Sequence, residues 1–158
     1  KIQKEKDNLE KILGSKIYGN RVHYLSNDEK LLKKLSELDF MYDSSFRKTK
    51  DTVTLEDMGY RQINKITEFP VTLMDAYIFT YMKIKEEKII ELVEKTLNSC
   101  RKLNLEFNVM TILWHDNVLK MKGGRMYSKI LEFLSSQDDV KLFTGIDLAM
   151  FLKRKNVL

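Results

Sequence analysis

Short apolar, β-prone runs alternate along this chain with longer segments in which apolar residues recur every three or four positions. The first pattern predicts strands and the second predicts amphipathic helices. Helices are expected over residues 2–13, 29–38, 86–103, 125–135 and 146–153. Strands are expected over residues 16–25, 40–42, 65–69, 105–113 and 140–143, with a loop over 46–62 and a segment, 71–82, that fits either type. Such alternation is typical of α/β folds with a parallel sheet or barrel.

The length of the chain limits which α/β architecture it can form. With 158 residues it suits one domain, residues 1–158, and no repeat or linker divides it. An eight-stranded (β/α) barrel typically needs about 250 residues, whereas only about five strands are visible here. We therefore expect either an open sheet or part of a barrel.

Charge and cysteine content exclude several classes of function. The 28 Lys and Arg residues are interleaved with 23 Asp and Glu residues, which gives a net charge of +5. This mixture indicates solvated helix surfaces, and no RNA-binding signature or Gly-rich phosphate loop points to a nucleic-acid partner. Cys100 is the only cysteine, so an intrachain disulfide is impossible, and its setting fits a buried hydrophobe better than a nucleophile.

Hydropathy gives an expectation about the compartment. No run approaches the roughly 20 apolar residues that span a bilayer, and the charged N-terminal helix is not a signal peptide. We expect a cytoplasmic protein without a membrane segment. The chain starts at Lys1 without a Met, so we also expect a processed product or a piece of something longer.

Polar residues that could carry chemistry follow the predicted strands, at the edge where α/β proteins place ligand and catalytic groups. The strand ends carry Arg21 with His23, Asp43, Glu68, Asp75, and His115 with Asp116. Because strand ends of a parallel sheet converge, these groups could share one pocket. His115 is the strongest candidate, as a general acid or as a buried structural histidine. Asp116 could orient its ring or cap the following turn.

The other strand ends each allow two interpretations. Arg21 and His23 are one residue apart and would share a face of a strand, either holding a catalytic carboxylate or forming an exposed pair. Asp43 could accept hydrogen bonds at the rim or cap a turn. Glu68, if buried, would need a partner such as Arg61 or Arg21.

Aromatic and metal-binding possibilities complete the candidate site. Tyr24 and Trp114, with Tyr18 and Phe79, could form a sugar-stacking surface or belong to the core. A zinc site within this chain would need both histidines and a carboxylate, because there is no His-x₃-His pair.

Several short segments, taken in order, resemble the polysaccharide deacetylase (NodB-homology) superfamily, and more narrowly its deacetylase-like branch. The segments are Gly19–Leu25, Leu32–Phe46, Gly59-Tyr60-Arg61, Glu68-Phe69-Pro70, Met74-Asp75 and Leu113–Asn117. They cover nearly the whole chain, and their order and spacing carry the resemblance.

The resemblance implies a distorted (β/α) barrel of about seven strands that removes N- or O-acetyl groups from polysaccharides with a divalent metal, usually zinc. Arg21 matches the arginine that pairs with the catalytic base, Asp43 is similar to an aspartate that lines the groove, and His115 matches the general acid. His23 stands where a proline is common in the family. The family's Asp-Asp pair, which gives the general base and a metal ligand, and its metal-binding His pair do not occur at the matching early positions. Asp138-Asp139 lies near the C-terminus, in the wrong order, so this chain offers none of the family's metal ligands.

We therefore expect the later βα units of a deacetylase-like domain, incomplete at its N-terminus, with a glycan as substrate. The expected catalytic residues are His115, Arg21 and Asp43, and the expected substrate-binding residues are His23, Tyr24, Trp114, Asp116, Glu68 and Asp75. The alternative is a non-catalytic domain that binds a glycan or a protein partner. Unpaired strand edges of an incomplete barrel would also predict self-association.

Overall fold

The computed structural model describes residues 1–26, 28–118 and 123–155, which divide into two compact units. Unit 1 comprises Lys1–Ser45, Arg61–Glu68 and Thr144–Leu158, and unit 2 comprises Phe46–Tyr60 and Phe69–Phe143. The chain therefore passes from one unit to the other directly after Ser45 and directly after Glu68, two of the predicted strand ends. The expectation of one domain stays a prediction.

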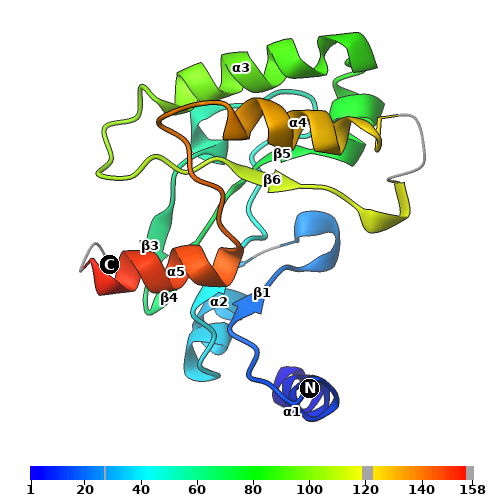
Figure 1. Ribbon diagram of the computed structural model, residues 1–158. Helices are drawn as coiled ribbons and strands as arrows, with labels where there is room; N and C mark the ends of the chain where they lie inside the picture. Colours follow the sequence, from blue (N-terminus) through cyan, green and yellow to red (C-terminus); the bar gives the residue numbers. More distant parts are fainter. Residues whose placement is uncertain (27, 119–122, 156–158) are drawn as a thin grey trace. The chain divides into compact units, whose positions relative to one another are not determined.

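Unit 1 contains an open four-stranded sheet in the order β1-β2-β4-β3. Its elements are α1 (Ile2–Leu13), β1 (Gly19–Asn20), α2 (Glu29–Glu37), β2 (Tyr42–Asp43), β3 (Arg61–Ile63), β4 (Ile66–Glu68) and α5 (Gly145–Arg154). The pairs β1–β2 and β2–β4 are parallel, and β3 forms an antiparallel hairpin with β4 (Figure 1). The parallel pair β1–β2 requires a crossover, which α2 supplies.

Helix α2 fixes one side of this sheet. Its N-cap is Asp28, whose carboxylate accepts a hydrogen bond from the Leu31 N–H at 2.7 Å. Its apolar stripe then enters a core formed by Leu32, Leu35, Phe40 and Ile66. Full burial of each such side chain contributes about 1.5–3 kcal/mol, so this small cluster is what attaches the helix to the sheet.

Two glycines allow close packing around Tyr42 in unit 1. A β-carbon at Gly19 or at Gly145 would lie less than 3.0 Å from the Tyr42 ring. Gly145 is the first residue of α5, so the start of this helix lies directly against β2. Larger residues at either position would force the ring away.

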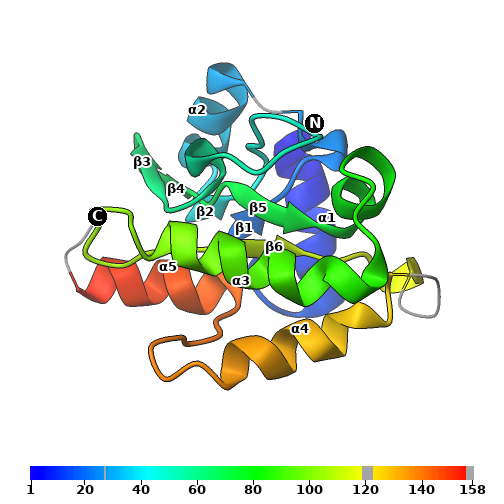
Figure 2. The same cartoon turned by 90° about the horizontal axis from the view of Figure 1, so that it is seen from above.

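Unit 2 contains a two-stranded parallel sheet whose strands are connected through a long helix. Its elements are β5 (Val71–Met74), α3 (Ile89–Cys100), β6 (Thr111–Leu113) and α4 (Met126–Ser135), with short helical turns at Leu55–Asp57, Tyr77–Tyr81, Glu86–Lys88 and Asp116–Val118. Helices α3 and α4 lie side by side on the same side of β5 and β6 (Figures 1 and 2).

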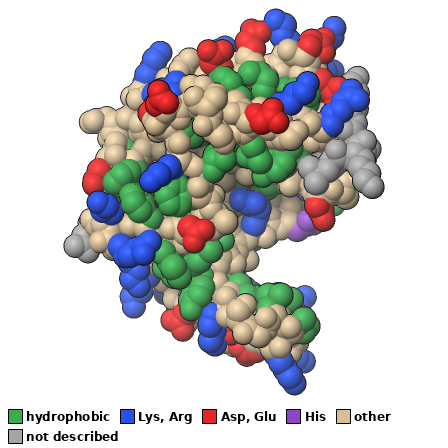
Figure 3. Space-filling view, viewed as in Figure 1, with side chains coloured by type: hydrophobic (Ala, Val, Ile, Leu, Met, Phe, Trp, Pro, Cys, Tyr) green, Lys and Arg blue, Asp and Glu red, His purple; other side chains and the backbone are tan. Residues whose placement is uncertain are grey.

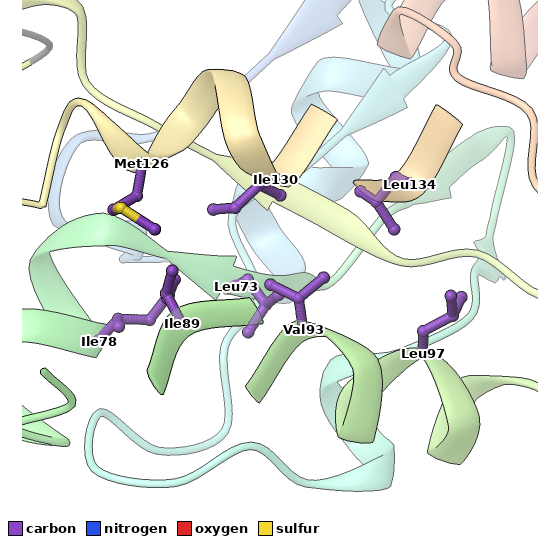
Figure 4. Packing of buried hydrophobic residues seen from close by; sticks show 8 residues of the cluster. All are labelled: Leu73, Ile78, Ile89, Val93, Leu97, Met126, Ile130 and Leu134. Atoms are coloured by element: carbon purple, nitrogen blue, oxygen red, sulfur yellow. The ribbon is translucent and has the colours of Figure 1, made fainter. Parts of the chain in front are cut away.

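The core of unit 2 lies between these two helices and β5 (Figure 4). It contains Leu73, Ile78, Ile89, Val93, Leu97, Met126, Ile130 and Leu134. Cys100 is buried at the end of α3, and burial raises the pKa of its thiol to about 11. The prediction that Cys100 is buried is therefore confirmed.

Hydrogen bonds hold the segment between β2 and β3 in place within unit 2. The Arg47 guanidinium donates to the carbonyl oxygens of Thr52 at 2.7 Å and Val71 at 2.9 Å. Its Nε also lies 3.7 Å from the fully buried Asp57 carboxylate, which accepts the Lys48 N–H. These contacts attach the segment to the first residue of β5.

Several predicted strands differ from the structure. Residues 140–143 form no strand; they lead into α5 without a β partner, so that prediction is wrong. The strands predicted over 16–25 and 105–113 shorten to β1 and β6. No sheet closes among the described residues, so the fold is mixed α/β with open sheets, and a barrel is not observed.

The surface carries mixed charge. Over α3 and α4, basic and acidic side chains lie interleaved (Figure 3).

Among the described residues, no helix has both the length and the apolar character that crossing a bilayer demands.

Candidate functional site

In unit 1, polar residues form one row across the ends of the strands. Asn20 pairs in register with Asp43, Asp43 with Glu68, and Glu68 with Arg61. The row crosses all four strands and lies at the C-terminal ends of the three parallel ones. The predicted convergence of polar groups at strand ends is thus observed for Asp43 and Glu68.

Hydrogen bonds connect this row to the chain that follows β2. Asp43 Oδ1 accepts from the Asn20 amide at 2.6 Å and from the Ser45 hydroxyl at 3.0 Å. Glu68 Oε1 accepts from the Ser45 N–H at 3.1 Å. Asp43, Ser45 and Glu68 are almost wholly buried, and Asp43 Oδ2 has no hydrogen-bond partner in the described part of the chain. This cluster is a buried framework.

Arg21 attaches to the same framework. Its Nε donates to the Ser44 carbonyl at 2.9 Å, and its second terminal nitrogen donates to the Ser44 hydroxyl at 2.8 Å. Burial lowers the pKa of the Arg21 guanidinium, while the charges of Asp43 and Glu68 oppose that change. The charges of both carboxylates therefore act on Arg21, and the residue it binds directly is Ser44, which follows Asp43.

His23 and Tyr24 do not occupy the predicted strand. The chain leaves β1 after Asn20 and forms a 3-10 turn over His23–Leu25, so the expectation that Arg21 and His23 share a strand face is wrong. The Val22 N–H donates to the Ser45 hydroxyl at 2.9 Å instead of entering a strand ladder. As a result Tyr24 is 85% exposed.

In unit 2, the ends of β5 and β6 bring Asp75 and His115 together. These strands are parallel and pair Met74 with Leu113, so the residues just beyond them lie at the same edge. Asp75 Oδ1 lies 2.6 Å from His115 Nδ1, and Asp75 Oδ2 accepts the His115 backbone N–H at 2.9 Å. The Asp75 side chain is 4% exposed and the His115 side chain 43% exposed.

This geometry leaves one ring nitrogen available. Nδ1 of His115 faces the carboxylate, which fixes the ring orientation and the proton on that nitrogen. Nε2 has no hydrogen-bond partner among the residues described. A buried carboxylate that orients a half-exposed imidazole is an arrangement suited to proton transfer or to binding a hydroxyl group.

Trp114 lies beside this pair as part of an aromatic cluster. Its ring stacks on Tyr127, with centroids 5.9 Å apart and planes at 27°, and meets Phe79 edge-on at 6.0 Å. The indole Nε1 is buried without a hydrogen-bond partner in the described residues. Trp114 also packs against the core of unit 2. The role of Trp114 in substrate binding stays a prediction.

Asp116 begins a short 3-10 turn and is exposed. Its Oδ1 accepts the Asn117 N–H at 2.8 Å, which is the turn-capping role considered for it. Its role at the substrate stays a prediction.

The metal implied by the family resemblance does not fit the residues present. Among the described residues, no three His, Cys, Asp or Glu side chains lie close enough to hold an ion. Nδ1 of His115 faces Asp75, and the His23 ring lies 4.0 Å from the Tyr24 ring. No catalytic step in this chain is therefore assigned to a metal.

The fold of this chain is similar to that of a solved structure. A crystal structure from Mycobacterium smegmatis, provisionally described as a polysaccharide deacetylase, superposes on 96% of this chain with a TM-score of 0.66 and 21% identity. The fold is polysaccharide deacetylase-like. This chain spans 54% of the length of that protein.

A 4-alpha-glucanotransferase from Thermococcus litoralis has a TM-score of 0.48 and 19% identity over 92% of this chain and 24% of that one. No protein-family model matches the chain, and no curated protein matches its sequence.

The structure thus groups the predicted residues of this deacetylase-like fold in two places. Arg21, Asp43 and Glu68 come together in unit 1, and His115 and Asp75 come together in unit 2. Sequence reasoning did not single out Asn20 and Tyr127. Asn20 lies directly before Arg21 at a strand end, which could have indicated it, whereas the 13-residue separation of Tyr127 from Trp114 carries no local signal.

Proposed function

We propose that this chain carries the proton-donating part of a deacetylase-type hydrolase that acts on an acetylated glycan. The observation that carries the proposal is the His115–Asp75 pair, in which Nδ1 is held at 2.6 Å while the ring stays 43% exposed. The polysaccharide deacetylase-like fold supports acetylated glycans as the substrate class.

The chemistry needs a proton donor. In hydrolysis of an acetyl amide or ester, the oxygen of water bonds to the acetyl carbon, water loses a proton to solvent, and the C–N or C–O bond breaks. The departing nitrogen or oxygen must then take up a proton. His115, when protonated on both ring nitrogens, gives up the Nε2 proton, while its Nδ1–H stays on the ring and continues to donate to Asp75. General acid catalysis of this kind contributes about 10²–10⁴-fold in rate.

A second candidate is a glycan-binding domain without turnover. It is favoured by one specific observation: the described residues contain no group of side chains that could hold the metal of the family. In that case His115 Nε2 would bind a sugar hydroxyl and no acetate would be released.

Acetate release separates the two candidates. The substrates are N-acetylated chito-oligosaccharides and O-acetylated xylan, and the proteins are the native sequence, His115→Gln and a surface control, Glu132→Gln. We expect release by the native protein and the control, and at least about 100-fold lower kcat in His115→Gln with little change in KM. Equal rates in His115→Gln would overturn the role of His115. Glycan binding without any acetate release would overturn the hydrolase and establish the binding domain.

A further inference from the structure

The turn after β1 has a backbone conformation that ordinary residues avoid. Tyr24 and Leu25 have φ values of 61° and 53°, two consecutive non-glycine residues in the left-handed region. That region is unfavourable for residues with a β-carbon, because the β-carbon comes too close to the following carbonyl oxygen. Other non-glycine residues with positive φ include Asp39 and Asn64, whose side chains tolerate it better. The side chains of Tyr24 and Leu25 do not stabilise a positive φ in this way, so other contacts must hold the turn.

Those contacts come from the buried framework of unit 1. The Val22 N–H donates to the Ser45 hydroxyl, which itself donates to Asp43. Arg21 is fastened to Ser44 by two hydrogen bonds, and the Leu25 N–H closes the turn on the Val22 carbonyl at 3.0 Å. The turn is therefore anchored on the N-terminal side of its strained residues and closed by one hydrogen bond within it.

The anchored turn presents an aromatic ring to solvent. Tyr24 is 85% exposed, the highest value among the large apolar side chains described. The His23 ring lies 4.0 Å from it at 57°. Single exposed apolar residues are common and need no explanation. A strained backbone that holds such a residue in place does need one. Strain of this kind concentrates at ligand-binding positions.

We propose that the His23–Tyr24 turn is a sugar-stacking subsite of unit 1, in which the Tyr24 ring packs against the C–H face of a pyranose. The proposal rests on the glycan specificity proposed above. A tyrosine offers a large contact area at a low cost in side-chain entropy, because few of its bonds rotate, and the anchored turn holds its backbone in place. The His23 ring nitrogens and the Arg21 guanidinium, which belong to the same turn, supply hydrogen-bonding groups suited to sugar hydroxyls.

The test uses the β-1,4-linked trimer of N-acetylglucosamine as probe, with binding measured by calorimetry and by NMR shifts of the Tyr24 ring. Tyr24→Gly removes the ring and suits the left-handed backbone. We expect affinity to fall by about tenfold in Tyr24→Gly, to be kept in Tyr24→Phe, and to be unchanged in Tyr81→Ala, an exposed tyrosine of unit 2. The Tyr24 ring resonances of the native protein should shift on titration.

Thermal unfolding distinguishes a binding role of Tyr24 from a merely structural one. Because glycine relieves the strain, Tyr24→Gly should unfold at the same temperature as the native protein or higher. A lower midpoint, native affinity in Tyr24→Gly, or ring resonances that do not move would each overturn the subsite. The outcome is separable from the hydrolase proposal. Intact acetate release with Tyr24-independent binding removes the subsite alone, and Tyr24-dependent binding without acetate release removes the hydrolase alone.

Discussion

In each unit a buried carboxylate lies at or just after the end of a parallel strand, but the two carboxylates contact different kinds of partner. Asp43, at the end of β2, accepts hydrogen bonds from Asn20 and Ser45, and Ser45 is itself fully buried. Asp75, just after β5, binds the backbone and ring of His115, a side chain that solvent reaches. The first arrangement fixes the path of the chain, and the second orients a group that can exchange protons. Strand-end position alone does not distinguish framework from chemistry; the exposure of the partner does.

The largest effect should follow from removing the framework carboxylate. Asp43→Ala leaves the Asn20 amide and the Ser45 hydroxyl without their acceptor in a site closed to water. We expect the free energy of unfolding, measured in urea, to fall by about 3 kcal/mol or more. Asp43→Asn keeps an acceptor oxygen and should be milder.

Asp138→Ala is the matched control for this change. Asp138 is an exposed carboxylate, and its loss should change stability by less than about 0.5 kcal/mol. If Asp43→Ala were no less stable than Asp138→Ala, the framework assignment for unit 1 would be wrong.

Asp75→Asn should give the opposite result, with a large change in turnover and a small one in stability. An amide facing the ring donates to Nδ1 and so moves the neutral ring proton to Nε2. We expect kcat for acetate release to fall at least about tenfold with KM nearly unchanged, and ¹⁵N NMR of His115 to report the other tautomer. Asp138→Asn serves as the carboxylate-to-amide control. An unchanged tautomer together with an unchanged kcat would leave Asp75 with a structural role only.

Sequence patterns predicted the helices and the strand ends, because both depend on local periodicity and capping. The segments around Asp43, Glu68, Asp75 and His115 could be identified in this way, and their pairing follows from the parallel order of the strands. The turn at His23–Leu25 could not be predicted, since alternating residues suggested a strand. What ends that strand is a hydrogen bond from Val22 to the Ser45 side chain, 23 residues away.

The packing of Trp114 could not be predicted, and the strand over 140–143 was predicted wrongly, for a related reason. The contact of Trp114 with Tyr127 and Phe79 depends on tertiary packing and has no sequence period. Residues 140–143 have the apolar content of a strand, but a strand also needs a neighbour to pair with, and the described residues supply none.

The smallest expected effect is the loss of stability at low pH that comes from Glu10, a residue of unit 1 that forms ion pairs with two lysines. The Ile17 N–H donates to Glu10 Oε1 at 3.0 Å, and Lys16 and Lys6 lie 2.9 Å and 3.0 Å from its oxygens. The backbone hydrogen bond, followed by the two lysines, lowers the pKa of Glu10 to about 2. A carboxylate with a depressed pKa stabilises the fold above its unfolded value of 4.5 and loses that contribution as pH falls towards 2.

Hydrogen exchange of the Ile17 amide measures this contact directly. Protection in the native protein should decline between about pH 4.5 and pH 2. Glu10→Gln retains an acceptor for Ile17 but loses the two lysine contacts, so its protection should start lower and show no step in that range. Glu5→Gln, an exposed change on the same helix, should behave as the native protein does. A decline of equal size in Glu10→Gln would show that Glu10 is not the group responsible for the acid sensitivity of the Ile17 amide.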